Sequence, residues 1–165
     1  MRRRRFLLLI ILVWLAQNCA SQNISINILS QKSGTARIGD TIYVELTILN
    51  TDPTDTLPVY KLRPLISIPA SAVELATDGH SLPEGWEFIQ RERGAVRLTN
   101  GTDRMEPNSG RRIILKLIGR QTGGPHKIAA NLMFSNGATP GSSPGTSTKG
   151  DNPADNSSIT TCQIL

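Results

Sequence analysis

Apolar and polar residues alternate along several short segments of this chain. Alternation with a period of two is typical of a strand that buries one face, because successive side chains of a strand point to opposite sides. The pattern, rich in β-branched residues, recurs over 24–28, 42–48, 113–117, 128–134 and the threonine-rich 159–165. No segment repeats apolar residues at helical spacing over three turns. We therefore predict an all-β protein.

Turn-forming residues separate the predicted strands. Asn100-Gly101 lies between two apolar segments and indicates a turn such as that of a hairpin. Pro83-Glu-Gly85 precedes a further short strand predicted over 86–90. Short strands separated in this way are typical of an all-β sandwich or barrel.

Two regions depart from the alternating pattern. Residues 57–75 are rich in apolar side chains but contain Pro58, Pro64 and Pro69. Proline cannot donate to a strand ladder, so we expect edge strands or irregular connections there. Residues 137–156 are rich in glycine, serine and proline and lack an apolar pattern, which predicts a long flexible loop before the last strand.

The beginning of the chain has the organisation of a secretory signal peptide. Four arginines precede an apolar run over 6–15 and a short tail that ends at Ala20. A membrane-spanning helix needs about 20 residues, so we predict that residues 1–20 are cleaved, leaving no transmembrane helix. One alternative is a lipoprotein anchored to the cell envelope through an acylated Cys19, and another is an uncleaved anchor. Residues 21–165 are predicted to form a single domain.

Removal of the leader changes the net charge and the cysteine count. The chain has 18 Lys and Arg residues and 13 Asp and Glu residues, and without the four leader arginines 14 basic residues remain, a net charge of +1. A nucleic-acid partner calls for a basic patch, whereas these residues are dispersed. The one local pair, Arg111-Arg112, is interpreted as a solvated strand end. Cys162 then has no partner for an internal disulfide, and we expect it to be buried in the last strand.

Four sequence landmarks occur in a characteristic order. A Gly39-Asp40 turn opens an alternating strand, Leu82-Pro-Glu-Gly-Trp86 follows, Gly110 precedes a late strand, and 151–157 form a turn rich in Asp and Asn. Over about residues 36–165 the chain thereby resembles the bacterial Ig-like repeat family called domain of unknown function 11. The resemblance implies an Ig-like antiparallel β-sandwich of about seven strands. It also implies a spacer or adhesion role in cell-surface proteins.

No catalytic arrangement is evident in the sequence, and we predict a protein without enzymatic activity. His80 and His126 stand singly beside turn residues and are interpreted as solvent-facing loop residues, because a zinc site needs three or four ligands. The oxygen-bearing residues that suit calcium are Asp151, Asn152, Asp155 and Asn156. Asp and Asn also form turns by bonding their own backbone. We predict no cofactor, with calcium as the alternative.

Trp86 and Phe88 share one face of a predicted strand. Aromatic side chains on a sandwich face can stack on a sugar or anchor a partner, although they more often belong to the core. The function we predict is a non-enzymatic, secreted or cell-surface interaction module with an unidentified protein or glycan partner at the cell envelope. The alternatives are the lipoprotein anchored through Cys19 and a carbohydrate-binding sandwich that uses an exposed Trp86.

Overall fold

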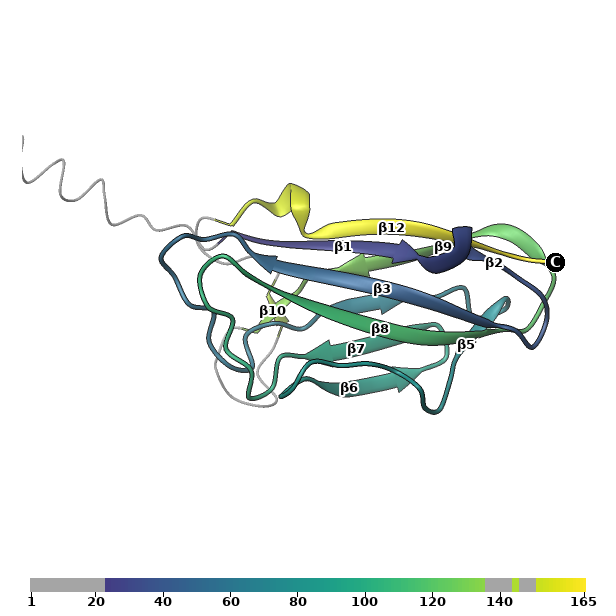
Figure 1. Ribbon diagram of the computed structural model, residues 1–165, viewed down its shortest axis with the longest axis horizontal. Coiled ribbons are helices and arrows are strands. Elements are labelled where there is room, and N and C mark those ends of the chain that lie inside the picture. Colours follow the sequence, from purple (N-terminus) through teal and green to yellow (C-terminus); the bar gives the residue numbers. More distant parts are fainter. Residues whose placement is uncertain (1–22, 136–143, 146–150) are drawn as a thin grey trace, which may run out of the picture.

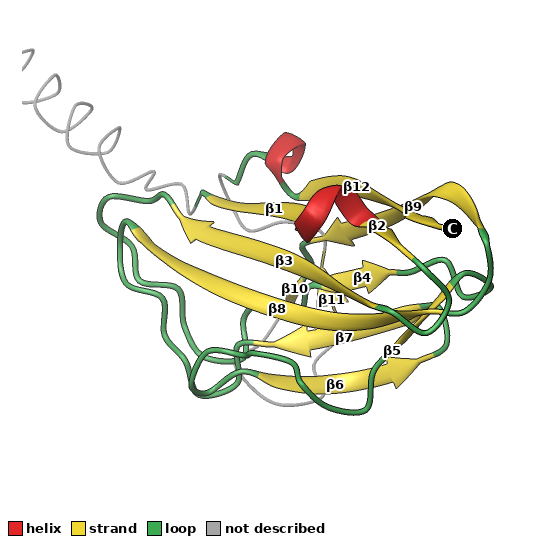
Figure 2. Cartoon of the chain, turned by 45° about the vertical axis from the view of Figure 1, so that its right-hand side comes forward, coloured by secondary structure: helices red, strands yellow, loops and turns green. Residues whose placement is uncertain are grey.

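The structure is a computed structural model of the full chain and describes residues 23–135, 144–145 and 151–165. These residues form two β-sheets that lie face to face with the hydrophobic core between them (Figure 1, Figure 2). The arrangement is an Ig-like β-sandwich, which confirms the predicted fold class. The predicted leader, with Cys19, and most of the predicted loop over 137–156 lie outside the described residues.

The first sheet consists of four antiparallel strands in the order β1-β3-β8-β5. Their bounds are β1 (Ile24–Ser30), β3 (Thr41–Asn50), β8 (Ser109–Gly119) and β5 (Val73–Leu75). The long central strands β3 and β8 pair from Thr41 opposite Ile118 to Asn50 opposite Ser109. β1 and β5 are the two edges of this sheet.

The second sheet consists of six strands in the order β2-β12-β9-β4-β7-β6, and β2 runs parallel to β12. Their bounds are β2 (Thr35–Ala36), β12 (Ser157–Ile164), β9 (Gly123–Asn131), β4 (Leu65–Ser67), β7 (Ala95–Thr99) and β6 (Glu87–Glu92). A separate pair joins β10 (Phe134–Ser135) to β11 (Pro144–Gly145). The described strands exceed the predicted seven because several, such as β2, span only two or three residues, too few to show alternation.

The alternating residues form the core as their pattern predicts. In β3 the side chains of Ile42, Val44, Leu46 and Ile48 are buried. Those of Tyr43 and Leu49, which point to the opposite face, are exposed. Full burial of one such aliphatic side chain stabilises the fold by about 1.5–3 kcal/mol. The predicted burial of Cys162 is confirmed, and loss of water contact raises the pKa of its thiol.

Three local predictions are wrong in part, for identifiable reasons. Within residues 57–75, β5 is an edge strand as predicted, but β4 lies inside the second sheet between β9 and β7, because Pro64 and Pro69 flank the strand and do not interrupt it. The Asn100-Gly101 turn connects β7 to β8, which lie in different sheets, so it is not a hairpin. The strand predicted over 128–134 is divided, since β9 ends at Asn131 and Phe134 belongs to β10.

One side of the sandwich is closed by side chains of β12 that reach the edge of β1. The backbone N–H of Ile28 donates to the Ser158 hydroxyl at 3.2 Å, and that of Ser30 donates to the Thr160 hydroxyl at 3.1 Å. Figure 1 and Figure 2 show β1 and β12 side by side along this side. We call β1 together with residues 157–160 the closed side. Its hydroxyls satisfy backbone donors that an edge strand otherwise leaves unpaired.

Helical structure is limited to two single turns, η1 (Gln31–Gly34) and η2 (Pro153–Asp155), within the described ranges. Neither turn is long and apolar enough to span a bilayer, and the described residues contain no other helix that could do so.

Candidate functional site

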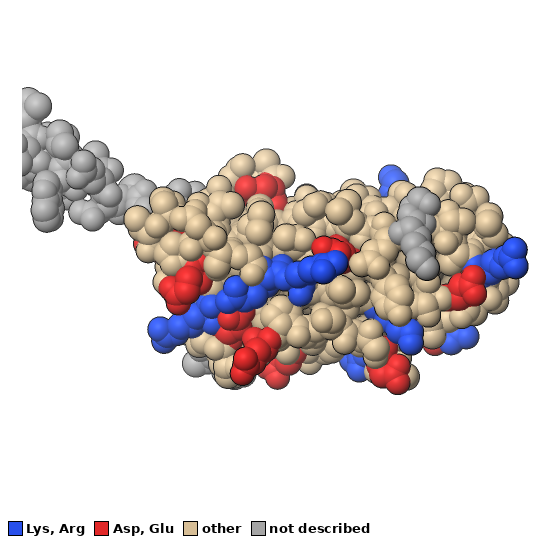
Figure 3. Space-filling view, in the orientation of Figure 1, with Lys and Arg blue, Asp and Glu red and all other residues tan. Residues whose placement is uncertain are grey.

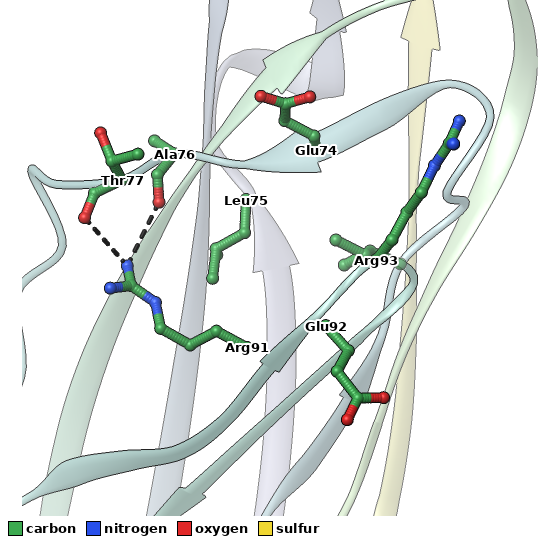
Figure 4. A pocket seen from close by; sticks show the side chains of 8 residues that line it. Glu74, Leu75, Ala76, Thr77, Arg91, Glu92 and Arg93 are labelled. Atoms are coloured by element: carbon green, nitrogen blue, oxygen red, sulfur yellow. Dashed lines mark hydrogen bonds between the residues drawn. The ribbon is translucent and has the colours of Figure 1, made fainter.

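The side of the sandwich opposite β1 is open. There the first sheet ends at β5 and the second ends at β6, and a hollow of about 390 Å³ lies between them (Figure 4). We call this region the open edge and define it by its lining residues, which are 74–77, 91–93 and Ile68. It combines two sheet edges with a cavity, a combination that suits recognition of an extended chain.

Local turns determine where β5 and β6 end. The N–H groups of Ala72 and Val73 both donate to the carbonyl of Pro69, which forms a tight turn immediately before β5. β6 and β7 form a hairpin whose turn includes Gly94, with φ of +89°, a value that favours glycine. A bulge at Ile89 interrupts the pairing of β6 with β7 and leaves this side chain 45% exposed. Both strands are therefore short or irregular, as natural edge strands often are.

Arg91 is the side chain that crosses the open edge. Its Nη2 donates to the carbonyl of Ala76 at 3.2 Å and to that of Thr77 at 3.1 Å, as the dashed lines in Figure 4 show. Its guanidinium carbon also lies 4.4 Å from the centre of the Phe88 ring. Because Arg91 belongs to β6 and the carbonyls follow β5, one side chain links the two sheets on this side.

His80 completes the group around Arg91. Its ring centre lies 5.1 Å from that of Phe88 in an edge-on contact, and its Nδ1 accepts the backbone N–H of Lys116. Burial lowers the pKa of His80, a hydrogen bond to the Ala76 carbonyl opposes this, and the nearby Arg91 charge lowers it further. Its Nε2 lies 3.0 Å from the Ala76 carbonyl oxygen and 2.7 Å from Arg91 Nη2.

Charges of both signs flank the apolar part of the hollow. Leu75 lies at its centre, with Glu74 and Arg93 at one end and Arg91 at the other (Figure 4). The hydrogen bond from Arg120 lowers the pKa of Glu74, so this carboxylate is ionised at neutral pH. Charged residues on an edge strand oppose indiscriminate pairing with other strands. The hollow therefore presents a mixed charge pattern.

Trp86 does not form the predicted ligand surface. Its side chain is buried, with 6% of its area exposed, and its indole N–H donates to the Asp103 carboxylate at 2.7 Å. Asp103 also accepts two hydrogen bonds from Arg111, at 2.7 and 2.8 Å. The prediction of a sugar-stacking face on Trp86 is wrong, because this network turns the indole inward.

Other predicted positions also differ from their sequence interpretation. Phe88 is partly buried against the core and lies under the guanidinium of Arg91, so it is not the open aromatic surface that was predicted. His80 is packed against Phe88, and His126 lies in β9 opposite Cys162, so neither is a solvent-facing loop residue. Arg91 was not identified as a functional residue from the sequence. The signal that was present is the charged run Arg91-Glu-Arg93 after the strand predicted over 86–90, which is typical of a protected edge strand.

The calcium candidates lie together beside the closed side. Asp151 Oδ1 accepts the backbone N–H of Ile24 at 3.2 Å, and Asn152 Oδ1 caps η2 by accepting that of Ala154 at 3.2 Å. These contacts are those of a turn. Asp155 and Asn156 differ, because the Oδ1 atom of each is buried without a donor. No group of three or more His, Cys, Asp or Glu side chains gathers anywhere in the described part of the chain.

The basic pair that opens β8 is engaged in ion pairs. Arg111 binds Asp103, and Arg112 Nη2 lies 2.6 Å from Glu45 on β3. The interpretation of this pair as a solvated strand end is therefore wrong for Arg111 and holds only in part for Arg112, whose side chain remains mostly exposed. Figure 3 shows a band of basic side chains across the face that carries β3 and β8, with acidic side chains along it. The visible face thus mixes both signs of charge.

Comparison with known proteins finds similarity in structure and not in sequence. No family model matches the chain, and no curated protein matches it significantly. A cohesin module of a family 33 glycoside hydrolase from Clostridium perfringens aligns with a TM-score of 0.54 at 15% identity, covering 86% of this chain and 98% of that one. The CARDB domain of the PF1109 protein from Pyrococcus furiosus aligns with a TM-score of 0.52 at 10% identity, covering 88% and 90%.

A third similar structure is the full-length major pilin SpaD from Corynebacterium diphtheriae. It aligns with a TM-score of 0.54 at 10% identity over 84% of this chain and 34% of the pilin. Identities this low establish a common fold and no more. The resemblance to domain of unknown function 11 stays a prediction, and the chain is structurally similar to Ig-like sandwich domains of several kinds.

Proposed function

We propose that this protein is a non-enzymatic interaction module that binds an extended segment of a partner protein at its open edge. The observation that carries the proposal is the position of β6, the last strand of its sheet, beside a hollow of about 390 Å³. An extended segment added to such an edge gains main-chain hydrogen bonds, while pockets beside the edge select its side chains. The buried Trp86 supports a protein partner over a glycan.

The lining of the hollow indicates which side chains a partner segment would place there. Ile68, Leu75 and Ala76 provide apolar surface, which favours an aliphatic side chain of the partner in the hollow. Glu74 and Arg93 lie beside this surface. A partner segment with one aliphatic anchor and flanking charges of both signs fits this lining best.

The module works outside the cytoplasm in this proposal. The support is the arginine-rich stub and apolar run of residues 1–20, which have the pattern of a cleaved signal peptide. Secretion of the full chain from a bacterial host, followed by mass measurement of the exported product, tests this. Cleavage after Ala20 supports a secreted protein, a diacylated Cys19 supports the envelope lipoprotein, and an uncleaved chain in the cytosol contradicts export.

Binding at the open edge can be tested with peptides and two matched variants. Linear peptides selected from a displayed random library on the wild-type chain serve as probes. Ile89→Lys adds a charge to β6 at an exposed position, whereas Ile159→Lys adds the same charge to β12, where Ile159 is 62% exposed. We expect the first variant to weaken peptide binding by about tenfold or more, because a lysine on an edge strand opposes strand addition.

The control variant should bind the selected peptides as the wild type does. Amide chemical-shift changes on peptide addition should centre on β6 and residues 74–77. Equal loss of binding in both variants, or shift changes confined to another surface, contradicts the proposal. Pairing of two copies through β6 is a separate outcome, recognised by a sedimentation coefficient that rises with concentration without peptide, and it also contradicts the proposal.

A further inference from the structure

The segment that leads into β12 gathers two carboxylates and an amide next to the start of β1. Asp151 uses one oxygen to accept the backbone N–H of Ile24, and its Oδ2 accepts from Asn156 Nδ2 at 2.5 Å. Asp155 lies between these residues in the single turn η2. The bond between Asp151 and Asn156 joins the two ends of a segment of six consecutive positions, and Asp155 lies within this segment.

Two oxygen atoms of this group have no hydrogen-bond donor. Asp155 Oδ1 and Asn156 Oδ1 are both buried and unpartnered, and Asn156 as a whole is only 7% exposed. The bond from Asn156 Nδ2 to Asp151 Oδ2 ties the Asn156 amide to the Asp151 carboxylate. Asn23 Oδ1, one residue before Ile24, is a further buried acceptor without a donor. Buried acceptors without partners are rare and costly, and a bound cation is one way to satisfy them.

The charges at this position are also uncompensated. Neither Asp151 nor Asp155 forms an ion pair with a Lys or Arg of the described residues. Burial and the neighbouring charge of Asp151 raise the pKa of Asp155. Two carboxylates that repel each other and have no ion pair within the described residues match the ligands that a hard divalent cation prefers.

We propose that Asp151, Asp155 and Asn156 form a calcium-binding site at the beginning of the closed side. Calcium takes six to eight oxygen ligands, and its tolerance of irregular geometry suits carboxylate and amide oxygens completed by water. Magnesium fits less well because it demands a near-ideal octahedron. With two carboxylates, the affinity belongs to the weak range of extracellular modules, with a Kd of about 0.1–1 mM. The ion holds the segment before β12 against the start of β1, and the site is separate from the open edge.

Calorimetric titration of the metal-free full chain with CaCl₂ tests the site directly. We expect heat of binding with a Kd of about 0.1–1 mM. We also expect the thermal midpoint to rise by about 2–6 °C at calcium concentrations ten times the Kd, because the ion binds only the folded chain. Magnesium should produce a smaller rise. Absence of both the heat and the rise in midpoint at millimolar calcium overturns the proposal.

Two substitutions and one control separate this site from general surface charge. Asp155→Asn removes the negative charge of a carboxylate whose Oδ1 accepts no hydrogen bond, so the change breaks no hydrogen bond at that atom. It should weaken calcium binding by about tenfold or more. Asp78→Asn removes a carboxylate that is 87% exposed and should bind calcium as the wild type does.

Asn156→Asp adds a third carboxylate to the group. It should lower the thermal midpoint of the metal-free chain through charge repulsion and enlarge the rise caused by calcium. Equal calcium affinities for the wild type and Asp155→Asn, or a calcium response lost equally in Asp78→Asn, overturn the proposal. The gain expected in Asn156→Asp keeps the test decisive if Asp155→Asn folds poorly.

Discussion

The two sides of the sandwich differ in whether the outer edge of the last strand is covered by side chains. β1 ends one sheet and β6 ends the other, so each strand has an outer edge without a neighbour in its own sheet. On the closed side, hydroxyls of Ser158 and Thr160 accept N–H groups of β1. At the open edge, the strand across the gap is the three-residue β5, and the Arg91 side chain of β6 donates to the Ala76 carbonyl that follows β5. An edge is therefore sealed or open according to the side chains that face it.

Removing the two hydroxyls should produce the largest effect on stability. In the double variant Ser158→Ala, Thr160→Val, the N–H groups of Ile28 and Ser30 lose their acceptors in a partly buried setting. A backbone donor left without a partner there costs about 1–2 kcal/mol, so we expect the free energy of unfolding to fall by about 2–3 kcal/mol. Urea denaturation of the variant and the wild type measures this difference.

A matched pair of changes at the open edge provides the control for that experiment. Glu92→Ala, Arg93→Ala removes two exposed side chains beside β6 and should change the free energy of unfolding by less than about 0.5 kcal/mol for each residue. If the two double variants are equally stable, the hydroxyls of β12 do not seal the closed side.

Loss of the Arg91 side chain should have an intermediate effect. Arg91→Ala removes the hydrogen bonds to Ala76 and Thr77 and the contact with Phe88, so we expect a loss of about 1 kcal/mol. Arg91→Lys should recover part of it, since lysine reaches one carbonyl but lacks the planar guanidinium. The neighbouring Arg93→Ala, which loses one long hydrogen bond to Ala70, is the comparison. A larger loss in Arg93→Ala than in Arg91→Ala contradicts the assigned role of Arg91.

The pH dependence of stability should reveal the packing of His80. Burial lowers the pKa of His80 in the folded state below the ordinary value of 6.5, so the unfolded chain binds the proton more readily. The free energy of unfolding should therefore decrease as the pH falls below about 6.5 and be fully present above it. His80→Asn, whose amide oxygen can replace Nδ1 as the acceptor for Lys116, should lose part of this dependence. Urea midpoints at pH 7.5 and 5.5 provide the measurement, and an equal pH dependence in both proteins contradicts it.

The regular strands of the core were predictable because the alternation of apolar and polar residues that defines each strand lies within the strand itself. The alternation of Ile42, Val44, Leu46 and Ile48 continues long enough to define one buried face, and β3 forms there. Residues 57–75 were less predictable because their prolines suggested an edge, whereas Pro64 and Pro69 only delimit β4. Which strand lies beside β4 depends on partners more than 25 positions away, such as Arg97 and Asn131 opposite Leu65.

The candidate site could be predicted from the sequence less well than the fold. Trp86 suggested a surface, but Asp103 and Arg111, which follow it by 17 and 25 positions, turn it inward. The open edge depends on two strands from different sheets both being last in order, a property of the whole topology. Asp151, Asp155 and Asn156 were identified by residue type alone, while the unpartnered oxygens of Asp155 and Asn156 could be recognised only in three dimensions.

Hydrogen–deuterium exchange of individual backbone amides tests the contrast between the two sides most directly. Although β1 is an edge strand, the amides of Ile28 and Ser30 should be protected by the hydroxyls that accept them. The outward-pointing amides of β6 should exchange much faster, because no strand lies beyond β6 in the described sheet. Comparable protection of the outer amides in β1 and β6, or faster exchange at Ile28 and Ser30, would contradict a sandwich sealed on one side and open on the other.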